Sequence, residues 1–203
     1  MKKLTILLLL IFSNTFLFAQ IAYKIQVGDQ LVYQVEAGNV EYDFIVTPTK
    51  LSSSGITFEY KMTEPANKTG TISMNEEALN NATAMYNRFS GGNVNLTDQT
   101  SVFASKKMMN EAEKGCADFF INGINSPAEH FETLQTDTSP TTNSTYIRWI
   151  KNINGNDYFL DGPIMENADG SKAIRFTDGD GFPFITFMEL DFKIYIKEII
   201  RKN

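Results

Sequence analysis

Polar and apolar residues alternate along much of the first half of the chain with the period of two that is typical of β-strands. The alternation runs through residues 30–36, 41–47 and 56–63, with Gly38-Asn39 and 52–55 as turn-forming breaks between them. A shorter run, 71–74, follows another turn. Successive strands joined by short turns pair as an antiparallel meander, and the alternation predicts one buried face and one face exposed to water.

The pattern changes to helical spacing after Asn75. Asn75 is a suitable N-cap, and Glu76 and Glu77 suit the positive end of a helix dipole. We therefore expect a helix from residue 76 to the Gly91-Gly92 pair, with an apolar face made of Leu79, Ala82, Met85, Tyr86 and Phe89.

A second, shorter helix is predicted over 106–114. Ser105 would cap it and Gly115 would end it. The apolar runs 102–103 and 119–121 on either side are expected to be strands. The side chains predicted to face inward are Met108, Met109 and Ala112.

The second half returns to strand patterns. Residues 146–151 and 158–160 flank Asn154-Gly155, a strong signal for a two-residue hairpin. Thr133–Thr145, rich in Thr and Ser, is expected to be an exposed loop or hairpin tip whose role the sequence leaves open. Further strands are expected at 173–176, 184–188 and 190–200. Together these patterns predict a mainly β (α+β) fold, an antiparallel sandwich or partly open barrel with one or two packed helices.

Residues 1–19 have the layout of a secretory signal peptide. Lys2 and Lys3 precede a short apolar run, and a small residue, Ala19, ends the segment. We expect cleavage after Ala19, which leaves one β-rich domain over 20–203. Gln20 would then be the first residue, so no cysteine is in place for a lipid anchor, and no later stretch is apolar and long enough to span a membrane.

The signal segment ends in Phe-Ala-Gln and resembles those of Bacteroidetes-type envelope proteins. Together with the β-rich layout, this resemblance implies a secreted or periplasmic location. It implies no activity.

Charge and composition narrow the classes of partner. Loss of Lys2 and Lys3 with the signal would lower the net charge from −6 to −8. An acidic protein lacks the basic face that nucleic-acid phosphates or anionic lipid surfaces require, so we expect no nucleic-acid partner.

Cys116 and His130 are the only cysteine and the only histidine. A single cysteine excludes an intramolecular disulfide, and we expect Cys116 to be buried because free cysteines are among the most buried residues. One histidine excludes zinc sites that need two or more, and His130 is expected to be exposed at the start of a strand. A Cys–His catalytic pair would need a hydrogen bond between the two side chains and a third group to orient the ring.

Calcium is the ion best supported by the sequence, because acidic and Asn-rich turns cluster late in the chain. Counted as a calcium-binding loop from Asp178, the pattern places Asp180 third and Glu189 twelfth. Phe182 and Pro183 stand where a ligand and a glycine belong, and Asp and Gly are also ordinary hairpin residues. No other cofactor is indicated.

Four phenylalanines, Phe182, Phe184, Phe187 and Phe192, lie close together in sequence. They suit a packed core, or the apolar lining of a site for a lipid or hydrophobic peptide. No serine-hydrolase elbow is present. The sequence therefore favours a non-catalytic exported protein that binds an envelope partner or small ligand, whether protein, glycan or hydrophobic molecule. Two alternatives stay open: a secreted hydrolase with a carboxylate pair, and a structural or assembly component of an envelope complex.

Overall fold

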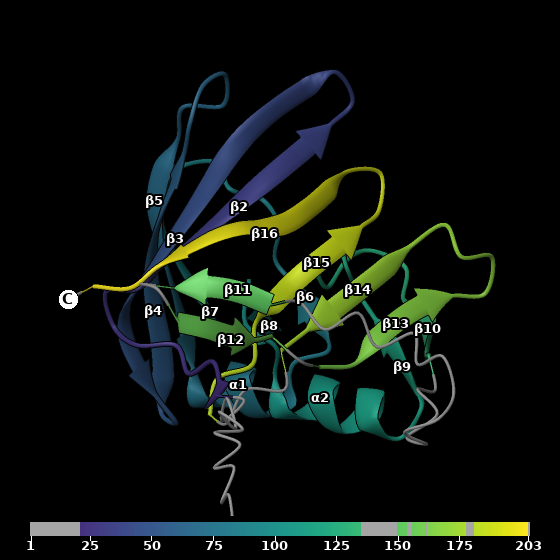
Figure 1. Ribbon diagram of the computed structural model, residues 1–203. Helices are drawn as coiled ribbons and strands as arrows, with labels where there is room; N and C mark the ends of the chain where they lie inside the picture. Colours follow the sequence, from purple (N-terminus) through teal and green to yellow (C-terminus); the bar gives the residue numbers. More distant parts are fainter. Residues whose placement is uncertain (1–20, 135–149, 154–155, 161, 178–180, 203) are drawn as a thin grey trace, which may run out of the picture.

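A curved sheet of 11 strands dominates the computed structural model, which describes residues 21–134, 150–153, 156–160, 162–177 and 181–202 (Figure 1). Neighbouring strands are antiparallel except β5 and β7, which are parallel. The sheet does not close into a barrel, and β7 and β9 form its two edges. In sheet order the strands are β7 (Gly92–Leu96), β5 (Thr69–Asn75), β4 (Gly55–Met62), β3 (Val40–Ser52), β2 (Gln30–Ala37), β16 (Lys193–Ile200), β15 (Ile185–Glu189), β14 (Ala173–Phe176), β13 (Ile164–Asn167), β10 (Glu129–Thr133) and β9 (Cys116–Phe119).

The predicted meander is confirmed in β2 to β5. Tyr33 of β2 lies opposite Phe44 of β3, and Phe44 lies opposite Met62 of β4. Residues that are opposite one another share a face of the sheet. All three side chains are buried, so the alternation in the sequence builds the inner face.

The first and last long strands of the chain meet in the middle of the sheet. β16 pairs antiparallel with β2, with Ile196 opposite Tyr33. This pairing joins an N-terminal half, β2 to β5 and β7, to a C-terminal half that runs from β16 to β9.

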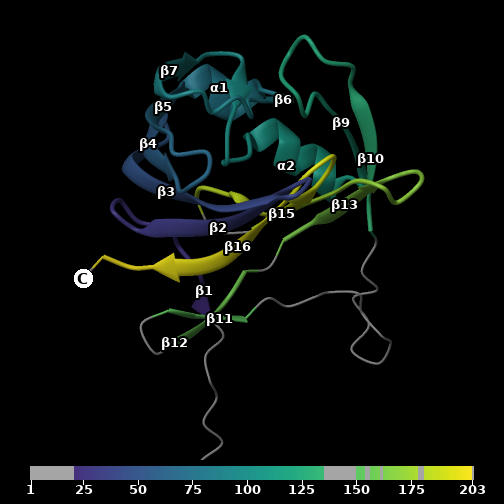
Figure 2. The ribbon, with the colours of Figure 1, turned by 90° about the horizontal axis from the view of Figure 1, so that it is seen from above.

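Two helices lie on the concave side of the curved sheet, α1 (Glu76–Asn81) and α2 (Lys106–Glu113) (Figure 2). The structure confirms the second predicted helix closely. The Ser105 hydroxyl accepts a hydrogen bond from the Met108 backbone N–H at 3.0 Å, and Met108, Met109 and Ala112 are buried.

The first predicted helix is much shorter than expected. The Asn75 cap is confirmed, but the helix ends at Asn81 and the chain then extends into β6 (Ala84–Met85), which pairs with β8 (Gln99–Thr100). Tertiary hydrogen bonds outweigh the helical periodicity here. The Met85 N–H donates to the Phe120 carbonyl at 2.9 Å. The N–H of residue 86 donates to the Thr100 carbonyl at 2.7 Å.

The strands expected beside α2 also differ from the prediction. Phe103 makes only an isolated bridge to Phe184. On the other side, β9 ends at Phe119 rather than continuing to residue 121.

A smaller sheet lies outside the arc of the large one and contains β1 (Ile21–Ala22), β12 (Asn156–Phe159) and β11 (Ile150–Ile153) (Figure 2). β11 and β12 pair as the predicted hairpin. Its turn residues, the signal segment 1–19 and most of the loop expected at 133–145 lie outside the described residues.

The buried side chains form two clusters. One lies mainly against the N-terminal half of the sheet and includes Phe44 and Phe58. The other lies beneath α2 and includes Met108, Phe119 and Phe176. Neither helix in the described part of the chain is long and apolar enough to cross a membrane.

Candidate ligand-binding site

Two adjoining spaces remain unfilled on the concave face of the large sheet. They share five lining residues, so we treat them as one feature, the apolar cavity. The larger space encloses about 280 Å³ and the smaller about 50 Å³. The shared residues are Phe44, Asn87, Phe89, Phe192 and Ile194.

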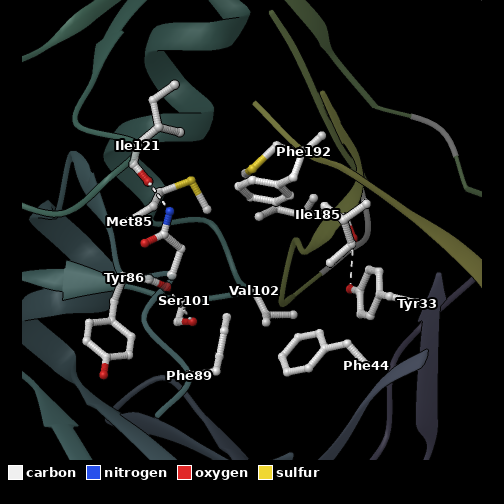
Figure 3. Close-up of a pocket in the computed structure, with 13 residues that line it drawn as sticks. Tyr33, Phe44, Met85, Tyr86, Phe89, Ser101, Val102, Ile121, Ile185 and Phe192 are labelled. Atoms are coloured by element: carbon white, nitrogen blue, oxygen red, sulfur yellow. Dashed lines mark hydrogen bonds between the residues drawn. The ribbon is translucent and has the colours of Figure 1, made fainter. Parts of the chain in front are cut away.

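Strands from both halves of the sheet build the wall of the apolar cavity. Val35, Ala37 and Tyr42 belong to β2 and β3, whereas Ile194 comes from β16. In the smaller space, the side chains drawn in Figure 3 surround a common centre, and these include Tyr33, Met85, Val102, Ile185 and Phe192.

Phe89 is held in the wall by other aromatic rings. Its ring centroid lies 4.5 Å from that of Phe44, 5.1 Å from that of Tyr60 and 6.2 Å from that of Tyr86. The Tyr60 hydroxyl in turn accepts a hydrogen bond from the Gly91 N–H at 2.9 Å. These contacts fix the segment that follows β6 over the concave face.

The backbone at Val102 is strained where it lines the apolar cavity. Its φ is 64°, which is unfavourable for a β-branched residue. The turn is secured on both sides, because the Phe103 N–H donates to the Ser101 carbonyl at 2.6 Å and the Ile185 N–H donates to the Val102 carbonyl at 2.8 Å. Backbone strain of this kind persists only where the surrounding structure holds it, and it is common at binding sites.

Two hydroxyl groups in the lining of the smaller space form hydrogen bonds within the protein itself. The Tyr33 hydroxyl donates to the Ile185 carbonyl at 2.8 Å, and the Ser101 hydroxyl donates to the Tyr86 carbonyl at 2.9 Å (Figure 3). Burial raises the pKa of both Tyr33 and Tyr42, so both phenols are neutral at pH 7. Among the described residues, no charged side chain lines the apolar cavity.

A third space, the polar hollow, adjoins the apolar cavity and encloses about 130 Å³. Tyr86 and Asn87 line both features. The Asn87 side-chain amide donates to the Ile121 carbonyl at 3.2 Å and to Asn122 Oδ1 at 2.8 Å, which ties the two walls of the hollow together. The remaining lining includes Arg88, Gln99, Asn122, Gly123, Ile124 and Asn125.

Only one of the three predicted calcium ligands lies within the described structure. Asp178 and Asp180 lie outside the described residues. Glu189 lies at the end of β15, where its carboxylate is 3.1 Å from the Lys193 ammonium. Within the described ranges, no group of three or more His, Cys, Asp or Glu side chains is placed to hold a metal ion. Calcium binding at Asp178, Asp180 and Glu189 stays a prediction.

The prediction that Cys116 is buried is wrong. β9 is an edge strand in which Ala117 and Phe119 point inward, so Cys116 faces solvent. His130 is exposed as predicted, and its Nδ1 atom lies 2.7 Å from Asp118 Oδ1. Cys116 lies opposite Glu132 and is therefore a diagonal neighbour of His130 on the same face. No hydrogen bond joins the thiol to the ring, so the described structure shows no activated nucleophile.

The four clustered phenylalanines divide between core and cavity. Phe184 is buried in the core and Phe182 packs against it, whereas Phe192 lines the apolar cavity. The ring of Phe187 lies 6.0 Å from the Lys193 ammonium. Phe44 and Phe89 also line the apolar cavity, and neither was predicted from the sequence to do so. For Phe44 the strand alternation was a usable signal, whereas Phe89 was assigned to a helix that ends before it.

Comparison of the chain with protein-family models, with curated proteins and with solved structures found no match in any of the three.

Proposed function

We propose that this is a non-catalytic exported protein that binds a hydrophobic small molecule in the apolar cavity. The observation that carries the proposal is unfilled space of about 280 Å³ with aromatic and aliphatic walls. Protein interiors are normally close-packed, and an apolar cavity of about 150 Å³ is already large enough to bind benzene. The signal-peptide layout of residues 1–19 supports the exported location.

The chemistry of the wall supports binding rather than catalysis. A catalytic site needs a nucleophile, an acid–base group or a metal within reach of the substrate. The described wall of the apolar cavity offers neutral phenols, the Asn87 amide, the Ser101 hydroxyl and otherwise apolar side chains. Such a lining favours an uncharged hydrocarbon or aromatic portion of a ligand.

Fluorescence of N-phenyl-1-naphthylamine, a neutral probe that brightens in apolar surroundings, tests the proposal. The protein should first be unfolded, freed of any resident ligand and refolded. We expect saturable binding of one probe per chain. In competition, lengthening a straight-chain alcohol by two carbons should tighten its binding about 15-fold until the apolar cavity is full.

Two matched variants locate the probe. Ala37 lines the larger space, so Ala37→Phe places a ring inside it. Glu41 lies nearby on β3 but is exposed and does not line the cavity, so Glu41→Phe adds the same ring outside it. Ala37→Phe should weaken probe binding at least about tenfold, whereas Glu41→Phe should not change it. Absence of saturable binding to the wild-type protein, or equal binding by the two variants, would overturn the proposal.

A further inference from the structure

We infer that the ligand is an anionic amphiphile with a single hydrocarbon chain, whose carboxylate binds in the polar hollow while its chain enters the apolar cavity. This inference rests on the proposed function and adds the chemistry of the headgroup. It is carried by the polar hollow, which the binding of a purely apolar ligand would leave unused.

The two features are contiguous. Asn87 lines both spaces of the apolar cavity and the polar hollow as well, so it lies where the three meet. A ligand in contact with Asn87 can therefore extend an apolar portion to one side and a polar portion to the other. Ile124, an exposed apolar side chain, also lines the hollow and offers contact to the first carbons of a chain.

Charge favours an anion in the hollow. Arg88 is the one charged side chain among the described residues that line it, and the other polar groups there include the amides of Gln99, Asn122 and Asn125. Arg88 is exposed and forms no ion pair within the described parts of the chain. Asp98, which is next in sequence to Gln99, forms no ion pair with Arg88. In a protein of net charge −6, a hollow with a guanidinium and amide donors and no carboxylate is complementary to a carboxylate ligand.

The hollow is also held in shape before any ligand binds. The Gly123 backbone has a φ of 89°, and the Gly123 carbonyl accepts hydrogen bonds from the Ser126 N–H at 2.9 Å and from the Ser126 hydroxyl at 2.7 Å. The Phe120 N–H donates to the Thr83 carbonyl at 3.1 Å, which anchors the start of the same loop. A preorganised loop lowers the entropy cost of binding a headgroup.

Competition against N-phenyl-1-naphthylamine with two ligands of equal chain length tests this inference. Dodecanoate and dodecanol differ only in the headgroup, and both are used below the concentrations at which they aggregate. We expect dodecanoate to bind about tenfold more tightly than dodecanol, as a charge-assisted hydrogen bond to Arg88 would provide. The difference should shrink at high salt because Arg88 is exposed.

Arg88→Gln should remove most of the preference for dodecanoate over dodecanol. Lys61→Gln is the matched control, since it removes one positive charge from an exposed residue of β4 that does not line the hollow. Equal binding of the two ligands by the wild-type protein, or an unchanged preference in Arg88→Gln, would overturn this inference alone. Failure of the probe and of both ligands to bind would overturn the proposed function instead.

Discussion

Replacement of Phe89 by alanine should destabilise the protein by about 2–3 kcal/mol. Fully buried Phe→Ala changes cost about 3–5 kcal/mol, and Phe89 is only half-buried because one side of its ring faces the unfilled space. Its ring contacts with Phe44 at 4.5 Å and Tyr60 at 5.1 Å lie within the range in which aromatic pairs add about 0.5–1.5 kcal/mol each.

The assay is urea unfolding at 25 °C, followed by far-ultraviolet circular dichroism. Phe187→Ala is the control, because Phe187 is half-buried as well but forms no ring pair with another described aromatic residue and lies outside the apolar cavity. We expect the control to lose about 1 kcal/mol. If Phe89→Ala loses no more stability than Phe187→Ala at an unchanged m-value, the contacts of Phe89 with Phe44 and Tyr60 do not hold the segment after β6.

Three further predictions concern other parts of the fold. Cys116 should react with a thiol reagent as fast in the native protein as in urea; slow native reaction would contradict its exposure on the edge strand. Burial raises the pKa of Tyr23 and Tyr33, so above pH 10 the unfolded chain loses protons that the folded chain keeps. The free energy of unfolding should then fall by about 1.4 kcal/mol per pH unit for each phenol. Urea titration at several pH values measures this fall, and constant stability between pH 10 and 11 would refute the prediction. Gly70→Ala should lower the free energy of unfolding, measured by heat or urea, by about 1–3 kcal/mol, because a Cβ there overlaps the Gly92 carbonyl oxygen on the paired strand. An unchanged free energy of unfolding would argue against the parallel pairing of β5 with β7.

Strand alternation and helix-capping residues were sufficient to predict the elements whose formation depends mainly on neighbouring residues. The alternation in 30–36, 41–47 and 56–63 corresponds to β2, β3 and β4, because one face of each strand must be buried and the other meets water. Ser105 and Gly115 bracket α2 as predicted, because capping depends on residues adjacent to the helix ends.

Tertiary contacts determined what the sequence could not show. Residues 82–89 have helical spacing, yet hydrogen bonds to Phe120 and Thr100, both distant in sequence, hold residues 84–86 in an extended conformation. That error concealed Phe89 as a wall residue. Cys116 was misplaced for a related reason, since exposure on an edge strand depends on the order of strands in the sheet.

The positions of the apolar cavity and the polar hollow could not be predicted from the sequence, although a hydrophobic molecule was one of the ligand classes expected from it. Phe44 of β3 and Ile194 of β16 line a common space because β2 pairs with both of these strands. Asn87 and Asn122 meet through a side-chain hydrogen bond between two loops that have no shared motif. Long-range geometry of this kind leaves no spacing pattern in the chain.

The central pairing of β2 with β16 also constrains the order in which the protein can fold. Strands β2 to β5 can form local hairpins among themselves, but the free edge of β2 must wait for β16, which lies far along the chain. Closing so long a loop is slow, and an unpaired strand edge is open to association with other chains in the meantime. Because Phe44 and Ile194 come from opposite sides of this junction, the ability to bind a ligand should appear only after β2 and β16 have paired.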